Sequence, residues 1–169
     1  DAFRFAQGQE LIAHNGMRVQ LRRPLDFLVV SDHAEYLGGY YRFNVGDSLV
    51  NETSAGRQWQ GYLEEGDPVK LIRAFTASMA DPKNNYPFPE KVRRLIWKDV
   101  AMTADEYNKP GQFTAFTGYE WTSMIEGNNL HRVVVYKDGA DKTAQLPPFS
   151  GQDSLDPHEL WKALALYEE

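Results

Sequence analysis

Apolar and polar residues alternate, run together or recur at helical spacing along the chain, and each pattern predicts a different element. The run Phe27-Leu28-Val29-Val30 is continuous and partly β-branched, which is typical of a strand in a parallel sheet covered on both faces. We predict this first strand over residues 26–31. A second strand is predicted over 113–121 and a third over 132–136, opened by His131.

Three longer helices are predicted from apolar residues at helical spacing and from start signals. Asp67-Pro68 is a helix start, with Asp67 as N-cap. The stripe that follows consists of Val69, Leu71, Ile72, Phe75 and Met79. A second helix over 90–107 has a predicted buried face of Val92, Leu95, Ile96 and Val100. The third runs from residue 157 to 169, with Asp156 as N-cap and Glu159 at the third helical position.

The remaining segments read as short elements and connections. Residues 3–16 suggest a short, imperfect helix that ends in a turn at His14-Asn15-Gly16, and residues 17–21 alternate like a strand. Residues 46–66 are loosely helical, and residues 81–89, with three prolines, form a connection. The pattern as a whole predicts a mixed α/β protein.

Composition limits the classes of function. A chain of 169 residues with 42% hydrophobic residues is predicted to form a single domain, or a fragment of one, with a sizeable core. Cysteine is absent, which excludes disulfides and thiol chemistry. The formal charge of −6 argues against a nucleic-acid surface, and no apolar run approaches the roughly 20 residues of a membrane span.

Candidate chemistry begins where the first predicted strand ends, at Asp32-His33. Functional groups in α/β folds gather at the carboxyl ends of strands, and a carboxylate beside an imidazole is a donor pair that many divalent metals accept. A second interpretation stays open at this point. Asp32 could be the N-cap of a following helix, with Glu35 at its third position.

Two further residues are predicted to join this pair. If the second and third strands form a hairpin, Glu120 near the end of one and His131 at the start of the next share a sheet edge. Two carboxylates and two imidazoles at one edge suit zinc, manganese or iron. Burying two carboxylates together without a cation would be costly, so their convergence itself indicates a metal or partial protonation.

Several motifs resemble those of known proteins. Leu28-Val29-Val30-Ser31-Asp32-His33 resembles the "TDH" motif of the PHP (polymerase and histidinol phosphatase) superfamily, and Thr117-Gly118-Tyr119-Glu120 resembles its "GxE" motif. The closer resemblance, over nearly the whole chain, is to domain-of-unknown-function family 3604, an uncharacterised family that we relate to PHP proteins. It is carried by Arg23-Pro24-Leu25-Asp26-Phe27, Asp32-His33-Ala34-Glu35-Tyr36-Leu37-Gly38, Tyr119-Glu120-Trp121-Thr122-Ser123 and Gly127-Asn128-Asn129-Leu130-His131-Arg132.

The resemblance implies part of a distorted (β/α)₇ barrel and a metal-dependent hydrolase, most often of phosphoesters or other small molecules. It implies metal ligands at Asp32, His33, Glu120 and His131, and substrate or outer contacts at Glu35, Asn129 and Arg132. No catalytic side chain is singled out, because a metal-activated water is the expected nucleophile. The superfamily's first His-x-His motif and its later motifs find no match here. We therefore expect a fragment with an incomplete metal site.

Other functions remain open from the residues. Tyr36, Tyr40, Tyr41, Trp59, Trp97 and Trp121 could supply the stacking surfaces of a carbohydrate- or peptide-binding module. The chain could also be an inactive fragment. A Ser-His-Asp triad is a poor alternative, because Ser31, Asp32 and His33 are consecutive and strand neighbours point to opposite faces. If a signal peptide preceded the chain, the protein would be periplasmic or secreted. The oligomeric state is left open.

Overall fold

A three-stranded sheet lies at the centre of the computed structural model, which describes residues 1–80 and 87–168. Its order is β3-β4-β5, formed by β3 (Phe27–Val30), β4 (Thr114–Ser123) and β5 (Leu130–Val135). β3 runs parallel to β4, and β4 forms an antiparallel hairpin with β5. The three predicted strands are therefore present, and the conditional hairpin between the second and third is confirmed.

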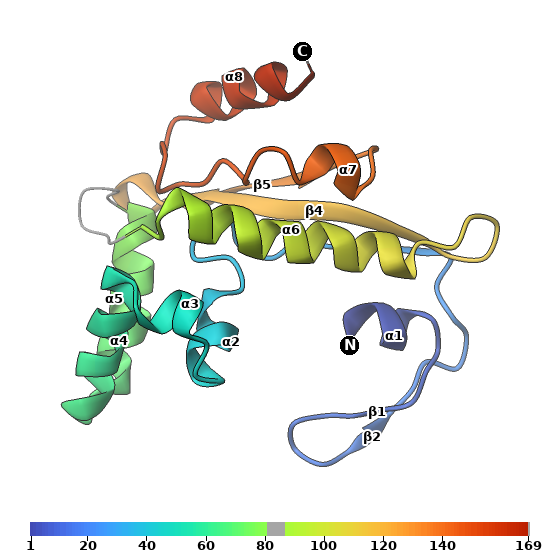
Figure 1. The fold of residues 1–169 in the computed structure, drawn as a ribbon, viewed down its shortest axis with the longest axis horizontal. Helices are drawn as coiled ribbons and strands as arrows, with labels where there is room; N and C mark the ends of the chain where they lie inside the picture. Colours follow the sequence, from blue (N-terminus) through green and yellow to red (C-terminus); the bar gives the residue numbers. More distant parts are fainter. Residues whose placement is uncertain (81–86, 169) are drawn as a thin grey trace.

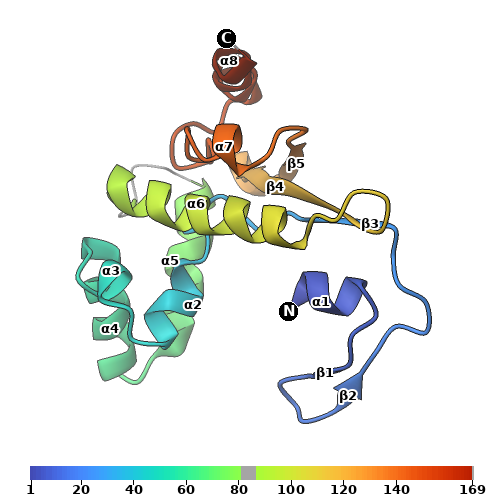
Figure 2. The same cartoon turned by 45° about the vertical axis from the view of Figure 1, so that its right-hand side comes forward.

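One long helix covers a face of this sheet. Helix α6 (Glu90–Tyr107) has the predicted bounds and lies along β4 in both views (Figures 1 and 2). Val92 and Ile96 are buried as predicted, whereas Leu95 is 41% exposed. Trp97, Ala101 and Ala104 complete the buried side of the helix, and Trp97 belongs to a core of aromatic residues.

Four helices lie between β3 and α6 in the sequence. In space they form a separate layer (Figure 1). They are α2 (Gly39–Asn44), α3 (Ser48–Asn51), α4 (Ser54–Glu64) and α5 (Pro68–Ala80). Thr53 caps α4 by accepting a hydrogen bond from Gly56 N at 3.0 Å. The predicted cap of α5 is confirmed, because Asp67 Oδ1 accepts from Val69 N at 3.2 Å.

The stripe predicted for α5 is only partly buried. Leu71 and Phe75 pack against the core, but Val69 is 49% and Ile72 is 65% exposed. The side chain of Met79 lies outside the described residues, and so does segment 81–86 of the predicted connection.

The N-terminal segment corrects the sequence prediction. Helix α1 (Ala2–Ala6) is followed by a small hairpin of β1 (Leu11–Ile12) and β2 (Arg18–Val19), so the predicted helix over 3–16 is wrong beyond its first turn. Leu11 pairs with Val19 across the hairpin, and its turn contains the predicted His14-Asn15-Gly16. Pairing with residues that follow in the chain overrides the weak helical spacing.

The C-terminal segment carries α7 (Ala140–Thr143) and α8 (Pro157–Glu168). The predicted N-cap is confirmed, since Asp156 Oδ1 accepts from His158 N at 2.9 Å. Glu159 pairs instead with Lys162 at 2.6 Å. Leu160 anchors α8 in the core, where it is fully buried. None of the helices in the described ranges is long and apolar enough to span a membrane.

The core is divided into three hydrophobic clusters that follow this layout. The first joins helices α2 to α4 with α6 around Trp59, the second joins β4 and β5 with α6 and α8 around Trp97 and Trp121, and the third joins α1, β4 and the end of α6 around Phe113. Four of the aromatic residues considered for a stacking surface are therefore core residues: Tyr36, Trp59, Trp97 and Trp121.

The other face of the central sheet is exposed along β3 and β5, which corrects the prediction of a strand covered on both sides. Phe27, Val133 and Val135, which lie on that face, are 63%, 54% and 49% exposed. The described residues form small sheets in a mixed α/β arrangement and no closed barrel. The predicted α/β class is confirmed.

Candidate functional site

Backbone hydrogen bonds extend the pairing of β3 and β4 beyond Val30 and fix Asp32-His33 beside Glu120. Glu120 N donates to Asp32 O, and Ala34 N donates to Glu120 O, both at 2.8 Å. His33 and Glu120 thereby form a parallel bridge. The end of the first strand is therefore held against β4, as the sequence argument required.

The close approach of β3 and β5 to β4 explains why glycine stands at position 118, two residues before Glu120. A Cβ atom on Gly118 would lie 2.5 Å from Val29 Cγ2 and 2.8 Å from the carbonyl oxygen of Val134. Since both neighbouring strands press on this position, only glycine fits there. Gly118 thus sets the packing of β3 and β5 on either side of β4.

Two histidines and one glutamate meet on the exposed face of the sheet. We call His33, Glu120 and His131 the histidine group. Nδ1 of His33 lies 3.3 Å from Glu120 Oε2, and Nδ1 of His131 lies 3.4 Å from Glu120 Oε1. The two rings are edge to face, with centroids 6.1 Å apart. Of the four predicted ligands, the structure brings these three together, from the ends of three strands.

Glu35 joins the same group from a buried position. Its side chain is fully buried, and Oε1 accepts a hydrogen bond from Gly151 N at 2.6 Å. Oε2 is buried without a hydrogen-bond partner among the described residues and lies 3.6 Å from His33 Nδ1. Glu35 was expected to make outer contacts with the site. The structure places it directly against His33, a predicted ligand.

The pKa of His33 is raised above its ordinary value. The interaction with Glu35 is the largest cause; burial opposes it, and the negative charges of Glu120 and Asp32 add to the increase. The imidazole therefore lies in a field that attracts positive charge.

The structure does not bring the other three predicted residues into the group. Asp32 is exposed, and its carboxylate has no hydrogen-bond partner within residues 1–80 and 87–168. It caps no helix, because α2 begins only at Gly39. The capping interpretation is therefore wrong. Asn129 and Arg132 are exposed, and Arg132 Nη1 donates to the backbone oxygen of His131 at 2.8 Å.

Sequence reasoning missed three residues that shape the group. Thr122 Oγ1 lies 3.0 Å from Nδ1 of both His33 and His131. Phe75 of α5 packs edge to face on the His33 ring at 5.6 Å. Gly151 binds Glu35. The hairpin register, which sets Thr122 opposite His131, could have indicated the first; no local signal indicates the other two.

Comparison with known proteins gives one match. The sequence model of the family described as "Protein of unknown function (DUF3604)" matches residues 1–169. The chain belongs to this family. No curated protein and no solved structure matches it. The expected membership of the uncharacterised family is thus confirmed.

The donor atoms of the histidine group and Glu35 in this DUF3604 chain are of the types that bind a divalent cation. Imidazole nitrogens and carboxylate oxygens are the ligands that zinc, manganese and iron accept, and the buried Oε2 of Glu35 lacks a hydrogen bond. In their present positions the side chains bond to one another. No group of three or more His, Asp or Glu side chains in the described part of the chain is placed to hold a metal as it stands.

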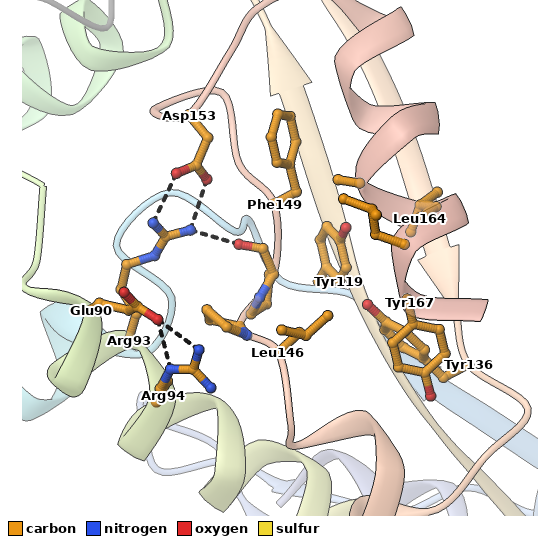
Figure 3. A pocket seen from close by; sticks show the side chains of 14 residues that line it. Glu90, Arg93, Arg94, Tyr119, Tyr136, Leu146, Phe149, Asp153, Leu164 and Tyr167 are labelled. Atoms are coloured by element: carbon orange, nitrogen blue, oxygen red, sulfur yellow. Dashed lines mark hydrogen bonds and ion pairs between the residues drawn. The ribbon is translucent and has the colours of Figure 1, made fainter. Parts of the chain in front are cut away.

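A pocket of about 360 Å³ lies on the opposite side of the sheet (Figure 3). Tyr119 lines it, whereas its strand neighbour Glu120 belongs to the histidine group, because successive strand residues point to opposite faces. The aromatic lining comes from Tyr119, Tyr136, Phe149 and Tyr167. The pocket and the histidine group are therefore two separate sites.

The charged groups of this pocket are already paired. Arg93 binds both carboxylate oxygens of Asp153, at 2.8 and 2.7 Å, and donates to the carbonyl oxygen of Pro148 at 2.7 Å (Figure 3). Arg94 pairs with Glu90 at 2.6 Å. Burial raises the pKa of Tyr136 to about 12, so this phenol is neutral at physiological pH. The pocket thus presents aromatic rings and neutral hydroxyls.

Proposed function

We propose that this DUF3604 chain carries the metal centre of a PHP-like, metal-dependent hydrolase, with phosphoesters as the favoured substrate class. One observation carries the proposal. His33, Glu120 and His131, from three separate segments, converge on one face of the sheet beside the buried, hydrogen-bond-deficient oxygen of Glu35.

Electrostatics support a cation at this position. Two carboxylates, from Glu35 and Glu120, lie within 3.6 Å of the same imidazole nitrogen. A buried carboxylate oxygen without a hydrogen bond costs about 1–3 kcal/mol, more for a charged group, unless something compensates it. Protonation of His33 or a bound divalent cation would supply that compensation, and the cation would serve both carboxylates at once.

The proposed ligands are His33 and His131, with carboxylate oxygens from Glu120 and from the buried Glu35. Zinc, manganese and iron all accept this set. A bound cation would lower the pKa of a coordinated water toward neutrality and make it a nucleophile for ester hydrolysis. The open sheet face beside the histidines is the side from which a substrate would approach, and further strands of a PHP-like barrel would continue from this sheet.

Metal binding by the purified protein tests the proposal. We expect stoichiometric Zn²⁺ or Mn²⁺ by elemental analysis, and a loss of affinity of at least about tenfold in His33→Ala and His131→Ala, in line with the loss of a metal-site group. His14→Ala and His158→Ala are matched controls, because both residues are exposed and distant from the group in the sequence. Absence of stoichiometric metal, or equal losses in all four variants, would contradict the proposal.

A binding module is the second candidate, and the aromatic pocket favours it. Aromatic rings with neutral hydroxyls suit stacking on a sugar or another uncharged small molecule. Tyr167→Ala, at the partly exposed ring of the pocket, would then abolish the binding of a neutral mono- or disaccharide followed by calorimetry, while His33→Ala would leave it unchanged. A panel of such sugars without any detectable heat would eliminate this candidate.

A further inference from the structure

A cleft of about 410 Å³ lies between helices α4 and α5, which pack side by side (Figure 1). Its described lining shares no residue with the histidine group or with the aromatic pocket. Helix α4 contributes Gln58 and Tyr62, and α5 contributes Lys70, Arg73, Ala74 and Ala77. The cleft is therefore a third site, on the helical layer rather than on the sheet.

Both charged side chains in the described lining of this cleft are cations. Lys70 binds Glu65, and that hydrogen bond raises the pKa of Lys70, so its ammonium group is charged. Arg73 has no hydrogen bond or ion pair with any residue of the ranges 1–80 and 87–168. The chain carries a formal charge of −6, so an unpaired guanidinium in a cleft without a lining carboxylate runs against the overall balance of charge.

Neutral donors and small side chains complete the cleft. Gln58 and Tyr62 are four residues apart on α4 and so lie on one face of that helix. Neither side chain has a hydrogen bond with another residue in the described part of the chain. Ala74 and Ala77 leave space between the helices, and the buried Tyr36 adds a second aromatic ring to the lining.

We propose that this cleft binds a small organic phosphate, with the guanidinium of Arg73 on the phosphate oxygens. The planar fork of arginine offers paired N–H donors to phosphate, and Gln58 and Tyr62 supply further donors. Because a phosphate monoester has three terminal oxygens, it can accept from all of these side chains at once. The tyrosine rings suit the organic part of the ligand. This site does not depend on a metal at the histidine group.

Calorimetry with phenyl phosphate, in the presence of EDTA, tests the proposal on the whole chain. We expect phenyl phosphate to bind more tightly than inorganic phosphate, and added NaCl to weaken the binding. Arg73→Gln should lower the affinity at least about tenfold, as expected for hydrogen bonds to a charged group. Arg73→Lys keeps the charge without the fork and should show part of the loss.

Arg23→Gln is the matched control, because it removes the same charge from an exposed arginine outside the cleft. Equal losses in Arg23→Gln and Arg73→Gln would overturn the proposal, since they would reflect net charge alone. An equal loss in His33→Ala would also overturn it and would place the phosphate at the histidine group.

Spectra of the wild-type protein give a readout that needs no variant. In ¹H–¹⁵N spectra we expect the Nε–H signal of Arg73 to shift as phenyl phosphate is added. An unshifted signal at saturation, or the absence of any binding heat, would overturn the proposal. These results are distinct from a failure of the protein to bind Zn²⁺ or Mn²⁺, which would overturn the proposed metal centre and leave the phosphate site standing.

Discussion

Oε2 of Glu35 lies 3.6 Å from Nδ1 of His33, and Oε1 of the same carboxylate accepts the backbone N–H of Gly151 at 2.6 Å. One buried side chain therefore links the histidine group to a loop more than a hundred residues further along the chain. The two oxygens have different surroundings, since Oε2 has no hydrogen bond within the described residues. This difference allows the structural and the metal-related roles of Glu35 to be tested separately.

Glu35→Gln and Glu35→Ala should differ in stability. Glutamine can still accept a hydrogen bond from Gly151 N and removes a buried charge, so we expect its free energy of unfolding to stay within about 1 kcal/mol of wild type, one hydrogen bond's worth. Alanine leaves the buried N–H without a partner and should cost about 1–3 kcal/mol. Urea denaturation measures both values. Equal losses in the two variants would show that the Gly151 contact contributes little.

Gly151 itself has no room for a side chain. A Cβ atom there would clash with the carbonyl oxygen of Thr122 and lie 3.0 Å from Glu35 Oε1. We expect Gly151→Ala to destabilise the protein by about 1–3 kcal/mol, the usual cost of overpacking, and to disturb the histidine group. Gly61→Ala is the matched control.

Gly61 lies inside α4 with open space around its Cβ position. Alanine should therefore stabilise the protein by about 0.5–1 kcal/mol through helix propensity. Thermal unfolding should show a lower midpoint than wild type for Gly151→Ala and a higher midpoint for Gly61→Ala. A Gly151→Ala variant as stable as wild type would mean that the loop moves away from Thr122 at little cost.

The sequence could predict those parts of the fold that local signals specify. Asp67 and Asp156 cap helices as predicted, because a side chain that accepts from N–H groups two or three residues ahead needs no distant partner. The meeting of His33, Glu120 and His131 follows from the parallel pairing and the hairpin register, which the strand patterns suggest as a condition but do not fix.

Long-range contacts could not be predicted in the same way. Leu11 and Ile12 have a helix-compatible spacing, yet they pair with β2. Glu35 reads locally as a helix-start residue, and its carboxylate is buried only because the loop at Gly151 returns to it. Exposure of Phe27 depends on which face of the sheet α6 covers, and a continuous apolar run does not encode that choice.

Stability should depend on pH through Asp153. Burial acts to raise its pKa, but the hydrogen bonds and charge of Arg93, together with bonds from Ser150, outweigh burial and hold the pKa below its ordinary value. A carboxylate with a lowered pKa stabilises the fold above its unfolded pKa, near 3.9, and loses that contribution as pH falls through the folded value.

Asp153→Asn should therefore lower the free energy of unfolding by about 1–3 kcal/mol at pH 7, as expected for hydrogen bonds to a charged group. The difference from wild type should persist down to about pH 5 and shrink below about pH 4. Urea denaturation across this range measures it. Arg93→Lys keeps the charge but loses the two-pronged contact, so it should show part of the loss. A difference independent of pH would show that the charge of Asp153 is not the cause.

Trp97 ties α6 to the segment after β5. Its ring is fully buried and packs edge to face on Tyr119 at 5.9 Å, and Nε1 donates to the carbonyl oxygen of Thr143 at 2.7 Å. Trp97→Phe keeps an aromatic ring but removes the donor, so it leaves a buried carbonyl unpaired and should cost at least about 1–3 kcal/mol. Trp161→Phe on α8 is the control, because Trp161 is 47% exposed and its loss should stay within about 0.5 kcal/mol. Equal denaturation midpoints for the two variants would contradict the anchoring role of the Thr143 bond.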